Sequence, residues 1–169
     1  MTRRLRPASG DDAPAIAGVL VASCRAAHAG LVPQDLLDRL CPEAECRRVE
    51  GTLRAAGHHT EVLDDEGEIV GFSSIGPARN AGCRFSGELY ALYVRPDRFR
   101  SGVGRQLLQG AVAGFQWLGY ARAFLWTLDG YERARRFYGA GGWEREDVTA
   151  SLPPPHEVPI RRYRISWER

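Results

Sequence analysis

Residues 98–105 read RFRSGVGR, and this density of glycine and arginine is the clearest chemical feature of the chain. Gly102 and Gly104 allow the backbone to approach a ligand closely and to adopt positive φ at little cost. The helical pattern that follows begins with N–H groups that lack a helical partner and carry a partial positive charge, which suits phosphate. Four arginines add the charge that a pyrophosphate attracts: Arg95, Arg98, Arg100 and Arg105. The loop therefore predicts a phosphate site.

A strand and a helix must position this loop. The strand pattern over 88–94 alternates, with one face expected to carry Glu88, Tyr90, Leu92 and Val94, and the other Leu89, Ala91 and Tyr93. Proline at 96 ends this strand, because proline cannot donate to a ladder. From residue 102 to the glycine at 119, apolar residues recur at helical spacing. The apolar run 124–128 follows that helix, so we expect a buried strand parallel to the central one.

Other phosphate-binding loops match less well. A dinucleotide fingerprint needs a third glycine where this chain has Leu107, and no acidic ribose partner follows the next strand. A Walker-type Gly-Lys-Ser/Thr sequence is also missing after the glycines. A dinucleotide-binding domain is therefore the disfavoured hypothesis.

The strand and loop resemble the acyl-CoA signature of the GNAT superfamily of N-acetyltransferases, in which V-x-P leads into Gln/Arg-x-x-Gly-x-Gly/Ala and a helix. Here Val94-Arg95-Pro96 precedes residues 99–104, FRSGVG, so Phe99 stands where the signature has Gln or Arg. Residues 131–138, YERARRFY, resemble the second GNAT motif, Asn-x-x-Ala-x-x-Phe-Tyr, with Tyr131 in the place of Asn. The resemblance covers nearly the whole chain, with the motifs in the family's order.

The resemblance implies a single acetyltransferase domain over residues 1–169 with a GNAT-like three-layer α/β fold. Its centre would be a mixed, mostly antiparallel sheet of about seven strands with a splayed parallel pair, flanked by about four helices. Strand patterns occupy 3–6, 60–63, 68–75, 88–94, 124–128, 143–151 and 159–167. Helical patterns run from a cap at 9 to about 29 and then over 34–40, 43–56, 102–118 and around 134–138.

The resemblance also implies which residues hold acetyl-CoA as a co-substrate. The pantetheine arm would pair with the backbone of Leu92, Tyr93 and Val94 in the gap between the splayed strands. Tyr131 stands where the family contacts the same arm. The loop amides would take the pyrophosphate, and they belong to Arg100, Ser101, Gly102, Val103, Gly104 and Arg105.

Transfer of acetate from a thioester to an amine requires that the amine lose a proton and that the leaving thiolate gain one. Tyr138 is the candidate general acid, since a phenol pKa near 10 keeps it protonated, and a core aromatic is the alternative. Glu88 is the candidate base, about 13 Å along the strand from Leu92, or else a carboxylate that orders a neighbour. Tyr90 and His28 are candidate acceptor-binding residues, with a solvated loop as the alternative for His28.

The predicted function is direct transfer, in a ternary complex, of acetate from acetyl-CoA to a primary amine of a small molecule or peptide. The alternative is an acyl-CoA-binding sensor or regulatory module without turnover. The acceptor stays open among amino acids, polyamines, antibiotics and protein amines, because one fold hosts many substrates. Dimerisation is common in the superfamily, so a homodimer is carried as an expectation.

Composition removes several classes of protein. The net charge of +2 does not favour a nucleic-acid partner. No run of 18 apolar residues occurs, so no membrane span is predicted. The four cysteines form no metal-binding spacing with histidine, so we expect no metal and reduced thiols in a cytoplasmic protein: Cys24, Cys41, Cys46 and Cys83.

Overall fold

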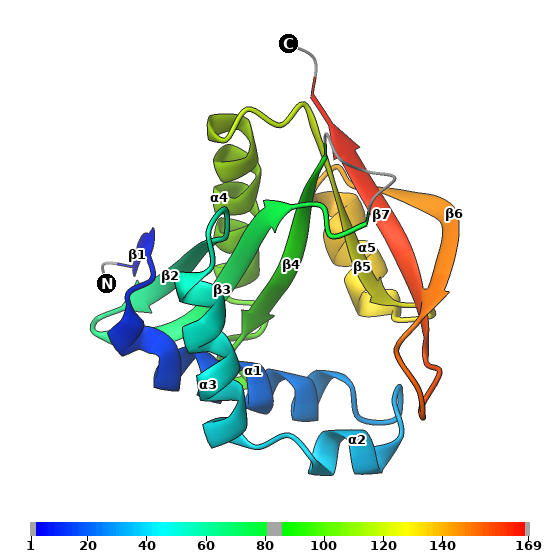
Figure 1. The fold of residues 1–169 in the computed structure, drawn as a ribbon, viewed down its shortest axis with the longest axis horizontal. Coiled ribbons are helices and arrows are strands. Elements are labelled where there is room, and N and C mark those ends of the chain that lie inside the picture. The colour runs from blue at the N-terminus through cyan, green and yellow to red at the C-terminus, as the bar shows by residue number, and fades with distance from the viewer. Residues whose placement is uncertain (1–2, 81–85, 168–169) are drawn as a thin grey trace.

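The computed structural model describes residues 3–80 and 86–167, and seven strands form one sheet (Figure 1). The order across the sheet is β1-β2-β3-β4-β5-β7-β6. Only the β4–β5 pair is parallel among the described neighbours, and the other pairs are antiparallel. The strand bounds are β1 Arg3–Pro7, β2 His59–Asp65, β3 Glu68–Pro77, β4 Gly87–Val94, β5 Arg122–Leu128, β6 Glu144–Ser151 and β7 Pro159–Ser166. The expected mixed sheet with one parallel pair is confirmed.

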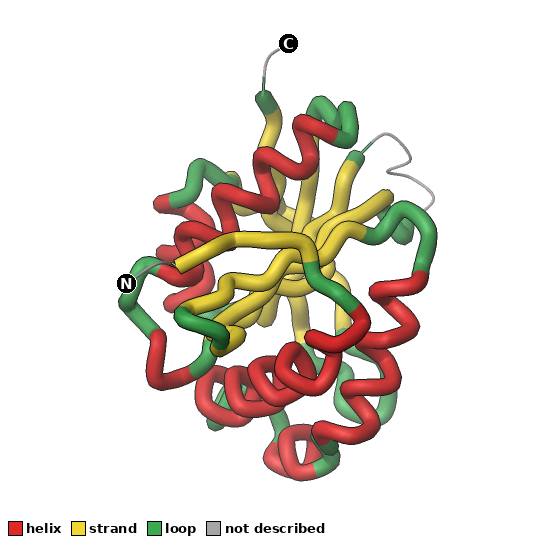
Figure 2. The backbone as a smooth tube through the Cα atoms, turned by 90° about the vertical axis from the view of Figure 1, so that its left-hand side faces the viewer, coloured by secondary structure: helices red, strands yellow, loops and turns green. Residues whose placement is uncertain are grey.

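Helices cover both faces of the sheet and give the expected three layers (Figure 2). One face carries α1 (Ala13–Ala27) and α3 (Pro42–Arg54), and the other carries α4 (Val103–Trp117) and α5 (Glu132–Ala140). The described chain has five α-helices rather than about four, because the five-residue α2 (Gln34–Asp38) forms beside α1. Among the described residues, no helix combines the length and the apolar content that a membrane crossing requires.

The alternation of the strands divides the core between these two faces. Val62 packs with Ile16 and Val49 against α1 and α3, whereas its neighbour Leu63 packs with Leu107 against α4. Burying each such side chain stabilises the fold by about 1.5–3 kcal/mol. The sheet is therefore fixed from both sides, and its side chains cannot slip by one residue without exchanging the two cores.

A β-bulge interrupts β4 in the middle. Its pairing with β3 passes from Ser74↔Ala91 directly to Ile75↔Leu89, so Tyr90 is an extra residue without an opposite partner. The side chain of Leu89 consequently packs with the α4-side core, whereas Ala91 packs with the α1 and α3 side. The expected strict alternation over 88–94, with Leu89 and Ala91 on one face, was therefore wrong, because one inserted residue reverses the facing.

The parallel strands β4 and β5 separate soon after they meet. Their pairing runs from Gly87↔Ala123 to Leu89↔Leu125 and goes no further. The remaining residues of each strand, 90–94 and 126–128, line opposite sides of an opening that widens toward the lower part of Figure 1. The bulge stands where this separation begins.

Candidate functional site

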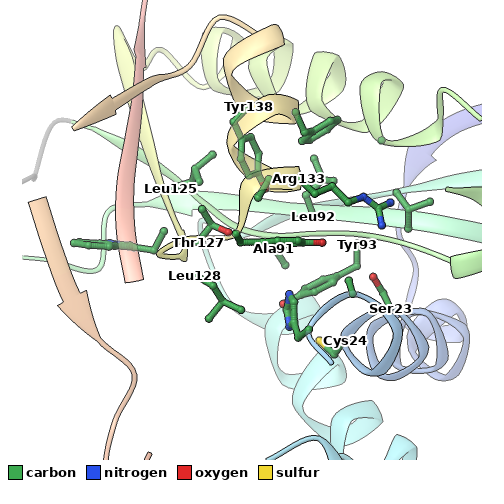
Figure 3. A pocket seen from close by; sticks show the side chains of 18 of the residues that line it. Ser23, Cys24, Ala91, Leu92, Tyr93, Leu125, Thr127, Leu128, Arg133 and Tyr138 are labelled. Carbon is green, nitrogen blue, oxygen red and sulfur yellow. The ribbon is translucent and has the colours of Figure 1, made fainter. Parts of the chain in front are cut away.

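A cavity of about 700 Å³ occupies the space between the diverging strands (Figure 3). Its walls come from β4 and β5, from the loop that precedes α4, and from α5 on one side of the sheet. The end of α1, the short helix α2 and the β6–β7 connection complete it. In Figure 3, Tyr138 and Arg133 reach in from α5, and Ser23 and Cys24 from α1. The cavity therefore has the size of a small-molecule site.

The predicted phosphate loop forms one end of this cavity. Gly102 has φ +86° and caps α4, and Arg100 also has positive φ, at +60°. No side chain caps the described N-terminus of α4, so its first amides keep no protein partner there. At Gly104, a Cβ would lie 3.2 Å from the ring of Phe137, so glycine lets α4 approach α5 closely. The amides are thus held at an open edge of the cavity.

The loop arginines divide into two groups. Arg95 is paired with Asp97 at 2.6 Å and with Glu68 at 3.1 Å, so its charge is already used. Arg98 lies 3.8 Å from Asp65. Two others line the cavity, and within the described part of the chain neither has a carboxylate within 4 Å: Arg100 and Arg105.

Arg133 on α5 adds a cation that the loop sequence does not reveal. Its guanidinium lies 3.9 Å from the centre of the Phe99 ring, and both residues line the cavity. Arg135 and Arg136, which follow on the same helix, instead pair with Glu132 at 2.6 and 2.9 Å. The basic run 133–136 was the available sequence signal, but only the fold shows which member faces the cavity.

Tyr138 lies in the cavity wall beneath three aromatic rings. Its ring centre is 5.1 Å from that of Phe137, 6.2 Å from Trp143 and 6.0 Å from Tyr163. Burial raises the pKa of the Tyr138 hydroxyl above its ordinary value of 10, and nearby Tyr131 adds to the shift. The hydroxyl is therefore protonated at neutral pH and is available to donate.

Glu88 lies outside the cavity lining. Its side chain is 2 % exposed, and it accepts hydrogen bonds from the Arg79 guanidinium at 2.6 Å and from the Arg79 backbone N–H at 2.9 Å. Arg79 itself lines the cavity and lies 4.6 Å from the centre of the Tyr90 ring. The carboxylate thus orders Arg79, which in turn contacts Tyr90.

The predicted acceptor residues, His28 and Tyr90, both line the cavity. The ring of His28 meets that of Tyr131 edge to face at 5.7 Å, and burial lowers the pKa of His28, which favours the neutral imidazole. The Tyr90 hydroxyl donates to the carbonyl of Pro77, and burial raises the pKa of Tyr90 to about 12. Both side chains are therefore uncharged at neutral pH.

The remaining predicted site residues divide between the cavity wall and its support. Leu92, Tyr93, Val94 and Tyr131 line the cavity together with the loop residues Arg100, Gly102, Gly104 and Arg105. Val103 is fully buried beneath the loop, and the Ser101 carbonyl accepts from Arg3 at 2.8 Å, so these two residues lie outside the lining.

Sequence reasoning missed the residues that α1 contributes. Ser23 and Cys24 line the cavity, and the Cys24 thiol hydrogen-bonds the Tyr93 hydroxyl. Burial raises the pKa of Cys24 to about 11, so this thiol is protonated at neutral pH. Cys41 and Cys46 are also free thiols, and Cys83 lies outside the described residues. No residue pattern within α1 distinguishes these two positions from its other buried ones.

Known proteins with similar sequence and fold agree in kind. The model of the acetyltransferase (GNAT) family matches residues 31–142. The uncharacterized N-acetyltransferase YuaI of Bacillus subtilis (strain 168) is 32% identical over 126 residues, which cover 74% of this chain and 71% of that protein.

Two solved structures have the same fold at lower identity. The PaiA N-acetyltransferase of Thermoplasma acidophilum, in complex with coenzyme A, superimposes with a TM-score of 0.80 at 17% identity, covering 96% of this chain and 98% of that one. The putative acetyltransferase yncA of Salmonella typhimurium, with acetyl-CoA, gives 0.76 at 17% identity, covering 100% and 96%. The family match and the YuaI relative confirm the enzyme class that the motifs implied: the chain belongs to the GNAT family of acetyltransferases.

Proposed function

We propose that the protein transfers an acetyl group from acetyl-CoA to a primary amine of a small molecule or peptide, directly within a ternary complex. The observation that carries this proposal is the opening between β4 and β5, with an uncapped helix N-terminus at one end and Tyr138 in its wall. A thioester arm can lie in such an opening while its diphosphate is held at the helix end. Coenzyme A, when bound, supplies the activated acetyl group.

The residues present fit the diphosphate of coenzyme A. Gly102, in the left-handed conformation, leaves open space where a Cβ would stand, so an anion can approach the amides. Arg100 and Arg105 supply charge without competing carboxylates in the described part of the chain. We infer that Arg133 supplies a third cation and replaces the contact that Phe99 cannot make, because its guanidinium stands on that ring.

The pantetheine arm is assigned to the exposed edge of β4. Beyond Leu89, the strand has no pairing with β5, so the backbone of Leu92, Tyr93 and Val94 faces the cavity without a neighbouring strand. An extended amide chain fits such an edge by forming the missing ladder bonds. Tyr131 lines the same wall and is assigned to the arm as well.

Tyr138 is assigned as the general acid that protonates the departing thiolate. Its hydroxyl is held protonated by burial, and its ring is fixed among aromatic neighbours, which limits its motion. A fixed donor near the sulfur atom would lower the barrier to departure of the thiolate. The acid therefore needs no neighbouring base to recharge it before the thioester binds.

The role of Glu88 as the base stays a prediction. Its carboxylate is held by Arg79, so a proton from the amine would have to reach it through water. Glu88→Gln keeps an acceptor for Arg79 and removes the basic oxygen, which separates the two roles. A base predicts a fall in kcat of about 100-fold or more, whereas ordering of Arg79 alone predicts a kcat close to wild type.

The proposal is tested by measuring coenzyme A binding and thiol release separately. Acetyl-CoA at 100 times its dissociation constant should stabilise the fold by about 2.7 kcal/mol. A panel of amines assayed for free thiol should then show acetyl transfer that Tyr138→Phe abolishes while binding persists. Binding without transfer to any amine would favour the acyl-CoA sensor, and absence of binding would reject both.

A further inference from the structure

We propose that the acceptor is a primary amine carried on an apolar body without a second positive charge. This proposal rests on the proposed acetyl transfer and names the substrate class of the same site. It arises from the cavity walls that remain once the phosphate loop and the β4 edge are assigned to coenzyme A. Those walls are called the acceptor half, and they include Val32, Leu36, Leu40, Leu128, Leu152 and Ile160.

The acceptor half is built by segments far apart in the sequence. α2 and the loop before it form one wall, and the β6–β7 connection forms the other, as the lower right of Figure 1 shows. His156 in that connection lies 3.4 Å from Asp35 on α2, so the two walls are joined outside the cavity. The acceptor therefore enters an enclosure with defined sides rather than an open surface.

No aspartate or glutamate lines the cavity anywhere within residues 3–80 and 86–167. Carboxylates do occur on the surrounding elements, but each is turned to a cation of the protein. Glu88 pairs with Arg79 at 2.6 Å, and Glu45 on α3 pairs with Arg48 at 3.0 Å. Two more complete this set, Asp35 with Arg39 at 3.6 Å and Asp129 with Arg161 at 3.0 Å.

The polar groups that do face the acceptor half are neutral. His28 is kept uncharged by burial, and Tyr131 is kept protonated. Such groups can orient one amine by hydrogen bonds, but they cannot balance a buried ammonium. A diamine or polyamine would therefore place its second cation against apolar walls, where an unpaired charge is strongly disfavoured.

The same walls act on the reacting amine. An alkylammonium has a pKa of about 10.4 in water, and an apolar surrounding without carboxylates lowers that value. The amine would thus lose its proton more readily on entering the acceptor half. This effect reduces the work left for a side-chain base, which agrees with the occupied carboxylate of Glu88.

The test compares two amines that differ in one charge. With saturating acetyl-CoA, kcat/KM for n-pentylamine should exceed that for 1,5-diaminopentane at least about tenfold. Leu36→Glu places a carboxylate in the acceptor half and should reverse this preference by about tenfold or more. Leu31→Glu is the matched control, because Leu31 is exposed, outside the cavity lining, and five residues away. It should leave the preference unchanged.

Each outcome has a separate meaning. Equal or better turnover of the diamine by the wild type overturns this inference while leaving acetyl transfer intact. Equal effects of Leu36→Glu and Leu31→Glu overturn the assignment of the acceptor half, since the effect would then be one of long-range charge. Thiol release with neither amine nor any other, despite acetyl-CoA binding, rejects the proposed function itself. If Leu36→Glu fails to fold, Leu40→Glu makes the same test from the same wall.

Discussion

Replacement of Arg133 by alanine should weaken coenzyme A binding through the loss of one cation at the diphosphate. The guanidinium stands 3.9 Å from the Phe99 ring, and no described carboxylate lies within 4 Å of it, so its charge is free for a ligand. A hydrogen bond to a charged group contributes about 1.5–3 kcal/mol. At 1.36 kcal/mol per factor of ten, the dissociation constant should rise roughly tenfold to a hundredfold.

Calorimetric titration with coenzyme A measures this change, and S-acetylpantetheine, which lacks the diphosphate, provides the comparison. Arg133→Ala should alter kcat/KM for S-acetylpantetheine by less than about threefold, because no phosphate contact is lost. Arg136→Ala is the matched control, since that arginine is 77% exposed, pairs with Glu132 and is outside the cavity lining. Equal losses for coenzyme A and S-acetylpantetheine, or an equal effect of Arg136→Ala, would refute the assignment.

Three further predictions concern the acid, the loop and the N-terminal ion pair. Tyr138→Phe should lower kcat by about 100-fold or more without changing the dissociation constant of coenzyme A; in the wild type, the raised pKa should keep the pH profile of kcat from falling below pH 10, and a fall near pH 8 would contradict the acid role. Gly102→Ala should destabilise the fold by about 1–2 kcal/mol in urea titrations, because φ is +86° although the Cβ would meet no atom within 4 Å, and an unchanged midpoint would contradict this. Asp12 has its pKa lowered from 3.8 to about 2, chiefly by hydrogen bonds from Arg6, so its stabilisation is present above pH 3.8 and is lost as pH falls through 2. Asp12→Asn should therefore lose about 2 kcal/mol at neutral pH and show a flatter stability profile between pH 4 and 2, and a profile parallel to wild type would contradict the linkage.

The features that depend on neighbouring residues were predictable from the sequence. The Ser9–Asp12 capping box, the break at Pro96 and the left-handed Gly102 each follow from local backbone chemistry, and all three occur. The parallel β5 was predictable too, because a helical crossover between strands constrains their direction. The phosphate loop was therefore located before its partners in space were known.

Contacts between distant segments were not predictable. β2 was expected to end at Leu63 because Asp64 and Asp65 suggest a turn, but β1 pairs beside them and Arg3 contacts Asp65 at 3.5 Å. Cross-strand charge pairing thus extends the strand beyond its apolar part. Likewise, the placement of Arg133 over Phe99 depends on how α5 packs beside the loop, which no spacing in the chain encodes.

The extra residue at Tyr90 has a consequence for the way such a chain can change over time. Because facing alternates, a one-residue deletion there would turn Leu92 and Val94 toward α1 and would send Ala91 and Tyr93 toward α4. Four side chains would have to exchange size and polarity together before the shortened strand could pack. The irregularity is thus protected against repair by single mutations, and the slot it opens is inherited with it.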